Sequence, residues 1–350
     1  MMRKTAIMQS EVFLKHDPGP GHVEVPARLL GLYRELASDE QRRRFLFPEF
    51  AAAGQEVLAL NHSHKYIAQV AATAGRPFEV LDPDTHTSPR SYEAACLAAG
   101  AAVAAVELVA AGEVDNAFAL VRPPGHHAEH AHSSGFCLFN NIAIAAHYAR
   151  QKLGFKRILI FDWDLHHGNG TQHAFDDSDQ VLFFSTHQFP CFPGSGTLSE
   201  VGRGKGEGYT INVPLPGGQD DAAFARICNE LLVPLARAYQ PELIMVSAGF
   251  DTYAGDPLGS MMVSELGYAY MTRVLTELAS QLCQQRLVLV LEGGYNLGIM
   301  ERGVLSCLGE MAADQAREEA EFAALRQAAP PLRALEQARE VAKKYWTIAG

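Results

Sequence analysis

The sequence predicts an α/β protein whose central, mostly parallel sheet is covered by helices on both faces. Short apolar runs alternate with longer segments that have helical spacing. Strands and helices in this alternation imply right-handed crossovers and a parallel sheet, and near-continuous apolar runs are typical of strands buried on both faces. The expected strands are residues 116–121, 157–161, 181–185, 242–247 and 286–291, and the expected helices are residues 91–112, 141–153, 221–239 and 264–284.

Each expected strand, taken in chain order, ends at a polar or glycine-containing segment. The alanine-rich helix at 91–112 leads into the first strand. In open α/β sheets, ligands bind at the carboxyl ends of the strands, so these segments are expected to converge on one pocket. They read Arg-Pro-Pro-Gly-His-His after residue 121, Asp-Trp-Asp-Leu-His-His-Gly-Asn after 161, Thr-His after 185, Ala-Gly-Phe-Asp-Thr after 247 and Glu-Gly-Gly-Tyr-Asn after 291.

Length and composition favour one large domain over residues 1–350. The segment at about residues 320–350 is expected to be peripheral and helical, with a charged helix after the Ala-Pro-Pro at 329–331. The glycine-rich stretch at 202–208 lacks the strand-to-helix context of a phosphate loop and is expected to be a surface turn. A net charge of −11 argues against a nucleic-acid partner and fits either solubility or a cationic substrate.

Cysteine usage and the N-terminal residues favour a cytoplasmic protein. The six cysteines are scattered without a C-x-x-C pair, so neither a disulfide framework nor a structural zinc knuckle is expected. The Met-Met-Arg-Lys-Thr start has no apolar stretch. No window approaches about 18 consecutive apolar residues, so we expect no membrane partner.

Residues 161–166, Phe-Asp-Trp-Asp-Leu-His, are the most informative segment of the chain. If they continue the strand, Asp162, Asp164 and His166 project to the same side. Burying two carboxylates and an imidazole together is costly unless a cation compensates them. A catalytic zinc takes three protein ligands and leaves one position open, and Asp251 is the best third ligand.

Two further segments carry residues suited to catalysis. The adjacent His126 and His127 follow a rigid Pro-Pro-Gly turn, and one suits a general base while the other suits an acid or electrostatic partner. Asp162 and Asn169 are candidates to orient them. Tyr295 follows two glycines and suits a donor to a developing oxyanion. The alternatives are two capping histidines and a tyrosine packed under a loop.

Aromatic residues at two loop tips suit the walls of a channel for an apolar, linear chain. These are Phe136 and Phe192, which could equally be core residues. Cys137 and Cys191 lie beside them, but a cysteine nucleophile is not expected, because the histidines have a better role at the metal.

The ordered motifs resemble the zinc-dependent histone deacetylase superfamily, and most closely its class II branch, the bacterial histone-deacetylase-like amidohydrolases and the acetylpolyamine amidohydrolases. The resemblance runs from about His16 to Leu308. It implies an arginase-like fold and hydrolysis of an acetyl-type amide on a primary amine, with one zinc ion per chain and structural potassium or sodium.

The resemblance also implies a role for each matching residue. Zinc is expected on Asp164, His166 and Asp251; His127 is the general base, His126 its charged partner and Tyr295 the donor to the carbonyl, with Asp162 orienting His126 and Asn169 orienting His127. One monovalent cation site uses Asp162, Asp164, His166 and Ser185, and the other uses backbone oxygens near Phe175, Ser178, Val181 and Tyr209. The substrate pocket is expected to be lined by Gly135, Phe136, Phe192, Leu258 and Gly293, with Asp82 or Asp84 at its rim. Arg28 is expected beside an internal exit for acetate.

The substrate is left open by the sequence. Members that prefer polyamines resemble the class IIb type and carry a glutamate where this chain has Leu258, which favours an acylated lysine over an acetylated polyamine. Asp82 or Asp84 could still hold a cationic amine. A non-catalytic acyl-lysine binding module and a two-metal arginase-type centre are further alternatives. Iron in place of zinc, the acyl length and a homo-oligomer are also left open.

Overall fold

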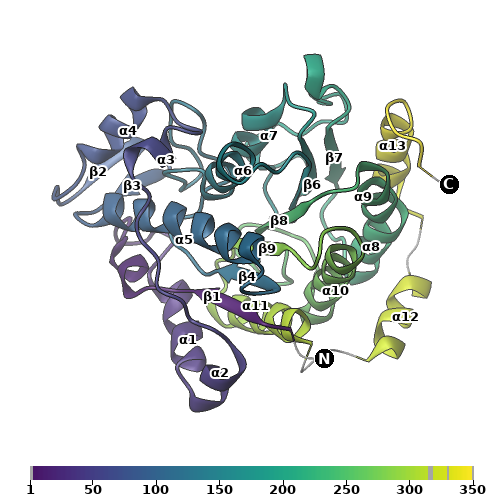
Figure 1. Ribbon diagram of the computed structural model, residues 1–350, viewed down its shortest axis with the longest axis horizontal. Helices are drawn as coiled ribbons and strands as arrows, with labels where there is room; N and C mark the ends of the chain where they lie inside the picture. The colour runs from purple at the N-terminus through teal and green to yellow at the C-terminus, as the bar shows by residue number, and fades with distance from the viewer. Residues whose placement is uncertain (1–2, 314–317, 329–330, 349–350) are drawn as a thin grey trace.

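A seven-stranded parallel sheet forms the centre of the computed structural model, which describes residues 3–313, 318–328 and 331–348 (Figure 1). The five predicted strands are confirmed, and a further strand lies at each edge of the sheet. In spatial order the strands are β1 (Thr5–Met8), β4 (Asn116–Ala119), β9 (Leu287–Leu291), β8 (Leu243–Ala248), β5 (Ile158–Asp162), β6 (Val181–Gln188) and β7 (Thr210–Leu215). The four strands whose loops carry the predicted site are therefore neighbours at the centre.

Two groups of helices flank this sheet. In one group α5 packs against α6, and in the other α10 packs against α8 and α11 (Figure 1). A small antiparallel hairpin, β2 (Glu79–Asp82) and β3 (Thr85–Thr87), stands apart from the main sheet. The helices are α1 (Ala27–Leu36), α2 (Asp39–Arg44), α3 (Gln55–Leu58), α4 (His64–Ala71), α5 (Ser91–Ala111), α6 (Asn141–Lys152), α7 (Asn169–Phe175), α8 (Asp221–Ile227), α9 (Val233–Tyr239), α10 (Glu265–Leu282), α11 (Leu297–Ala312), α12 (Glu319–Ala328) and α13 (Arg333–Ala342).

The alanine-rich α5 is a core helix that packs on α6 and β4. Its small residues allow close approach, since a Cβ at Gly100 would lie 2.0 Å from the Ala51 carbonyl oxygen. By length and composition alone this helix could also cross a membrane, but 67% of its most apolar window is buried inside the molecule.

The predicted helix over residues 221–239 is interrupted. It divides into α8 and α9 around a π-helical turn, Cys228–Leu232. Pro234 lies in the first turn of α9, where it needs no amide hydrogen. The apolar spacing continues through the turn, which is why the sequence pattern alone predicted one helix.

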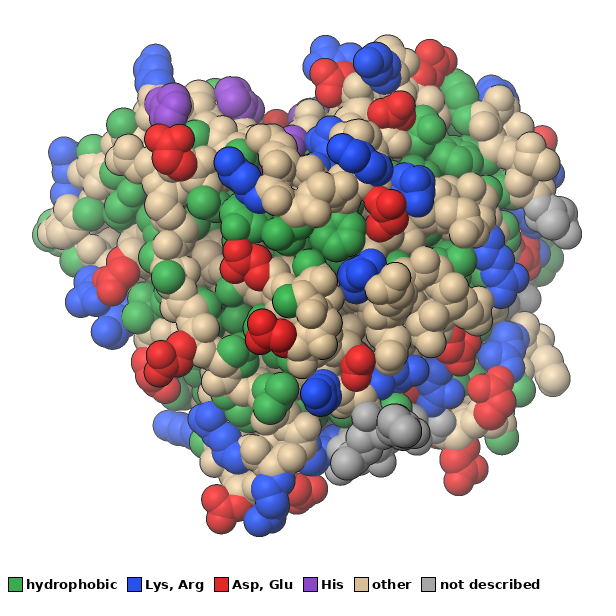
Figure 2. All heavy atoms as spheres, in the orientation of Figure 1, with side chains coloured by type: hydrophobic (Ala, Val, Ile, Leu, Met, Phe, Trp, Pro, Cys, Tyr) green, Lys and Arg blue, Asp and Glu red, His purple; other side chains and the backbone are tan. Residues whose placement is uncertain are grey.

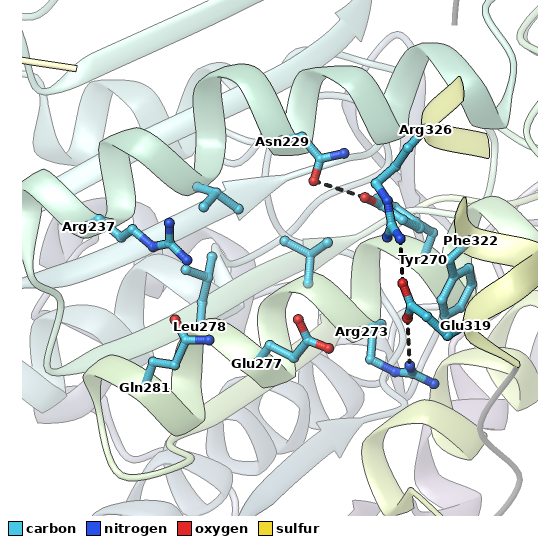
Figure 3. Close-up of a pocket in the computed structure, with 12 residues that line it drawn as sticks. Asn229, Arg237, Tyr270, Arg273, Glu277, Leu278, Gln281, Glu319, Phe322 and Arg326 are labelled. Carbon is cyan, nitrogen blue, oxygen red and sulfur yellow. Dashed lines mark hydrogen bonds and ion pairs between the residues drawn. The ribbon is translucent and has the colours of Figure 1, made fainter. Parts of the chain in front are cut away.

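The helix predicted after the Ala-Pro-Pro is α13, and a further helix, α12, precedes it. Ala329 and Pro330 lie outside the described residues, as do Met1 and Met2. In α12, Glu319 lies between Arg326 and Arg273, and Phe322 packs on Tyr270 (Figure 3). After α13, the indole Nε1 of Trp346 donates to the Gly208 carbonyl at 2.7 Å. The predicted glycine-rich turn is therefore in contact with the residues that follow α13. On the face seen in Figure 2, acidic and basic side chains are interspersed.

Candidate active site

The strand that carries the first motif does not continue through His166. β5 stops at Asp162, so Asp164 and His166 lie in the following loop and not on alternate strand positions. Side-chain-to-backbone bonds shape this loop: the Asp162 carboxylate accepts from the Asp164 amide at 3.2 Å, and the Asp164 carboxylate accepts from the His166 amide at 2.9 Å. The three side chains still meet at one site, but local turns bring them there.

Asp164, His166 and Asp251 form a buried group whose ligand atoms all lie within 4.8 Å of one another. One oxygen of each carboxylate accepts a backbone N–H, from Gly293 at 2.9 Å and from Leu165 at 2.8 Å. The other oxygens face Nδ1 of His166 at 3.2 and 3.0 Å.

The surroundings of this group fit a divalent cation. Burial, followed by the charge of Asp164, raises the pKa of Asp251 to about 7, because two carboxylates lie close together in a buried space. A dication between them removes that cost. A Cβ at Gly293 would lie 2.4 Å from an Asp251 oxygen, so the loop leaves room for the carboxylates only because this residue is glycine.

His126 and His127 lie side by side, with ring centroids 4.0 Å apart, and have different partners. Nδ1 of His126 lies 3.1 Å from an Asp162 oxygen, and Nδ1 of His127 lies 2.7 Å from the Asn169 side-chain oxygen. Burial alone would lower the pKa of His126, but Asp164 and Asp162 outweigh it and raise that pKa to about 10. Burial and the neighbouring His126 charge hold the pKa of His127 well below its usual range. These directions favour a charged His126 ring and a neutral His127 ring.

Tyr295 is fixed through its backbone and the two residues before it. Its amide donates to Asp256 at 2.7 Å, and Arg28 donates to the Gly294 carbonyl at 2.6 Å. The Arg28 guanidinium lies 5.0 Å from the Tyr295 ring centroid. Burial raises the pKa of Tyr295 well above its usual value, so the hydroxyl keeps its proton. Arg28 therefore supports the tyrosine loop; its predicted place beside an acetate exit stays a prediction.

Sequence reasoning missed three buried or half-buried carboxylates that hold the loops of the candidate site. Glu292 accepts from the amides of Gly125 and His126 at 2.6 and 3.1 Å. Glu129 accepts from the Asn169 side chain at 2.7 Å. Glu24 bonds to two buried arginines, Arg28 and Arg122. Only Glu292 had an available signal, because it begins the Glu-Gly-Gly-Tyr-Asn motif.

The predicted aromatic residues lie beside His127 and Tyr295. The Phe192 ring is 5.0 Å from the His127 ring, and the Phe136 ring is 5.7 Å from the Tyr295 ring, between centroids. Gly135 has a left-handed φ of 54°, and a Cβ there would lie 2.3 Å from the His127 ring. An aromatic wall and a residue without a side chain thus adjoin the histidine pair.

The other rim residues differ in what they bond. The Asp84 carboxylate accepts from the Gly135 amide at 3.1 Å, so one of its oxygens supports the loop. Within the described residues, no hydrogen bond occupies the half-buried Asp82 carboxylate. The Leu258 amide donates to Asp256 at 2.9 Å, which ties this residue to the tyrosine loop. Substrate binding by either aspartate stays a prediction.

The residues predicted for the monovalent cations lie near one another in two places. Ser185 is paired with Asp162 across β5 and β6, and its hydroxyl is 2.9 Å from Nδ1 of His187. At the second place, the carbonyl of Phe175 accepts from the Ser178 amide at 3.0 Å and that of Tyr209 accepts from the Phe183 amide at 2.9 Å, close to the start of β6 at Val181. Cation binding at either place stays a prediction.

A parallel sheet with a buried Asp-His-Asp group at its carboxyl edge is the arginase and deacetylase type of α/β fold. Comparison with known proteins then gives the family: a model described as the histone deacetylase domain matches residues 22–311. The chain belongs to the histone deacetylase family, as the motifs predicted.

Individual relatives support this assignment. A protein of Archaeoglobus fulgidus named as a probable deacetylase is 41% identical over 296 residues, which cover 84% of this chain and 82% of that protein. Human polyamine deacetylase HDAC10 is 39% identical over 306 residues, which cover 84% of this chain but 45% of that protein. The crystal structure of the HDA15 HD domain matches with a TM-score of 0.89 and 33% identity, covering 98% of this chain and 95% of that one.

Proposed function

We propose that this chain is a zinc-dependent amidohydrolase that removes acetyl or other acyl groups from lysine-like primary amines. The observation that carries the proposal is the position of two adjacent histidines beside a buried Asp-His-Asp group. Nε2 of His126 lies 3.8 Å from an Asp164 oxygen, and the ring centroids of His127 and His166 are 5.9 Å apart. A zinc ion held by Asp164, His166 and Asp251 would supply Lewis acidity, which makes a water more acidic and an acyl carbonyl more electrophilic.

The protein's own groups would move the protons. Neutral His127 donates its Nδ1 hydrogen to Asn169, so its Nε2 lone pair is available to take a proton from the attacking water. That proton then leaves on the departing amine as the C–N bond breaks. The charged His126 stabilises negative charge on the acyl oxygen, and the Tyr295 hydroxyl donates a hydrogen bond to the same oxygen.

Replacing Tyr295 with phenylalanine should separate turnover from binding. The variant loses one donor to the oxyanion, so we expect kcat for an acetyl-lysine peptide to fall by about a hundredfold or more. Affinity for the peptide should change little, because the aromatic ring stays beside Phe136. Steady-state kinetics and calorimetric titration on the zinc-loaded protein measure the two quantities.

The same experiment separates catalysis from simple recognition. A native protein that binds the peptide but turns over no acylated amine would contradict the proposal and favour a binding module. Unchanged kcat in Tyr295→Phe would contradict the role given to the hydroxyl while leaving the activity in place.

A second candidate substrate is an acetylated polyamine, because the rim carboxylate of Asp82 is free to hold a cationic amine. Leu258 argues for an acylated lysine, since a cationic substrate gains nothing from an apolar side chain there.

We also propose that the protein is cytoplasmic and binds no nucleic acid, because its cysteines are scattered and its net charge is −11. The domain proposed is the whole chain, residues 1–350, with α12 and α13 at its periphery.

Replacing Leu258 with glutamate should shift the preference toward polyamines. A carboxylate at this partly exposed position attracts a second ammonium group but gives no benefit to a neutral peptide. We expect the ratio of kcat/KM for acetylspermidine to that for an acetyl-lysine peptide to rise about tenfold. Leu258→Gln is the matched control without the charge, and an equal rise in that variant would contradict the electrostatic explanation.

A further inference from the structure

A chain of polar contacts runs from the neutral catalytic histidine toward the surface. Nδ1 of His127 lies 2.7 Å from Oδ1 of Asn169, and Nδ2 of Asn169 donates to Oε1 of Glu129 at 2.7 Å. Nδ1 of His173 lies 2.8 Å from the same Glu129 oxygen. The His173 side chain is 49% exposed, whereas that of Glu129 is 13% exposed, so the contacts connect the buried base to the surface of α7.

The side chain of Asn169, in the middle of these contacts, has two possible orientations. A carboxamide can present either its oxygen or its nitrogen to His127, and the two ends occupy nearly the same space. With the oxygen toward the ring, His127 must carry its proton on Nδ1, which leaves a lone pair on Nε2 as a general base requires. With the nitrogen toward the ring, His127 must accept at Nδ1, so its Nε2 carries the proton and the base is blocked.

Glu129 removes this ambiguity. An ionised carboxylate only accepts hydrogen bonds, so the Asn169 end that faces it must be the NH₂ group. Burial would raise the pKa of Glu129, but its bonds from His173 and Asn169 outweigh burial and lower it, so the group is ionised near neutral pH. The amide oxygen of Asn169 is then left to face His127.

The backbone of Glu129 is fixed from both sides. Its amide donates to the His132 carbonyl at 3.0 Å, and its carbonyl lies 2.8 Å from Nδ1 of His62. Nε2 of His62 accepts from the Asn140 amide at 2.9 Å. Burial lowers the pKa of His62 to about 4, so this neutral ring has a single hydrogen, which Nδ1 gives to Glu129. The backbone of Glu129 is therefore fixed beside Asn169, and its carboxylate reaches Asn169 and His173 from there.

We propose that Glu129 is a positioning residue that sets the tautomer of His127 by fixing the orientation of the Asn169 side chain. Within the part of the chain that the structure describes, the Glu129 carboxylate bonds to Asn169 and His173 and to none of the predicted metal ligands, so its effect on His127 passes through Asn169. This inference rests on the proposed function for its kinetic consequence, but its structural content, the position of one proton on His127, holds independently of turnover.

The kinetic test compares Glu129→Gln, Asn169→Asp and the double variant with the native protein, all zinc-loaded. Glutamine pairs with Asn169 in either orientation, so in Glu129→Gln we expect kcat to fall about tenfold with unchanged KM. Asn169→Asp places two carboxylates against each other, so we expect its kcat to fall further than that of Glu129→Gln. In the double variant the glutamine amide donates to the introduced carboxylate, so kcat should recover at least about tenfold relative to Asn169→Asp alone.

A matched control and a second readout make the test specific. Glu200→Gln removes a carboxylate that accepts from Gln172 at 2.7 Å and from Gly196 at 2.9 Å, and kcat should stay unchanged. Nitrogen-15 correlation spectra of the histidine rings report which nitrogen carries the proton, with His127 assigned by its loss in His127→Gln. We expect Nδ1–H in the native protein and a mixture of tautomers in Glu129→Gln.

The outcomes separate this inference from the proposed function. An unchanged His127 tautomer in Glu129→Gln would overturn it, and so would a double variant no faster than Asn169→Asp. A native protein inactive on every acylated amine would instead contradict the proposed function, and the ring spectra would still decide the role of Glu129.

Discussion

Replacing Asp251 with asparagine should remove zinc from the protein and lower kcat for acylated amines by at least about a thousandfold, equivalent to the several kcal/mol that a Lewis acid supplies. Asp251 provides one of two carboxylates around Nδ1 of His166, at 3.0 Å, and its other oxygen already accepts from Leu165. Asparagine fills the same volume but has no charge, so a dication would keep a single anionic ligand, Asp164.

The measurement is metal content by elemental analysis together with turnover of an acetyl-lysine peptide. Native protein should hold one zinc equivalent at this site and lose activity on exhaustive chelation, and zinc should restore it. Asp115→Asn is the control: Asp115 also accepts a backbone amide, from Lys4 at 2.8 Å, but lies before β4 at the opposite edge of the sheet. One retained zinc equivalent with native kcat in Asp251→Asn would contradict the ligand assignment, and two equivalents in the native protein would favour an arginase-type centre.

The central strands could be predicted because their signal is local. Each is an apolar run buried on both faces that ends in a polar segment, and the structure places all five in the sheet. The edge strands lack that signal: β1 has four residues, and β7 contains Pro214. Proline is tolerated at a sheet edge but argues against a strand when only the sequence is read.

The candidate site was predictable in its residues and less so in its geometry. Alternation along a strand was the wrong reason for grouping Asp162, Asp164 and His166, since the strand ends at the first of them. Bonds from backbone amides to the two aspartates produce the grouping instead. Glu24 and Glu129 could not be assigned from the sequence, because their partners lie far along the chain or belong to side chains whose orientation only the fold defines.

Replacing Glu24 with glutamine should lower the free energy of unfolding by about 3–5 kcal/mol, the usual cost of leaving buried charge uncompensated. The Glu24 carboxylate accepts from Arg28 at 2.9 Å and from Arg122 at 2.5 and 2.7 Å, and all three side chains are fully buried. His16 lies 3.3 Å from the same carboxylate. Glutamine preserves the shape but leaves two buried guanidinium groups without an anion.

The free energy of unfolding lost in Glu24→Gln should depend on pH, because it depends on the ionisation of the Glu24 carboxylate. Burial would raise the pKa of Glu24, but Arg122 and His16 outweigh it and hold that pKa well below the usual range. A carboxyl whose pKa is depressed by folding stabilises the protein fully above its unfolded pKa and loses that contribution as the pH falls toward the folded pKa. The difference between native protein and Glu24→Gln should therefore be full at neutral pH and shrink in acid.

Urea unfolding followed by circular dichroism at several pH values measures this difference. Glu79→Gln, which breaks the exposed pair with Arg76, is the control and should leave the unfolding midpoint nearly unchanged. Glu24→Gln should also lower kcat, because Arg28 holds the carbonyls of Glu292 and Gly294 beside Tyr295, each at 2.6 Å. If Glu24→Gln unfolds at the native midpoint at neutral pH, the buried pairs do not stabilise the fold, and the arginines must find another anion or water when Glu24 is neutralised.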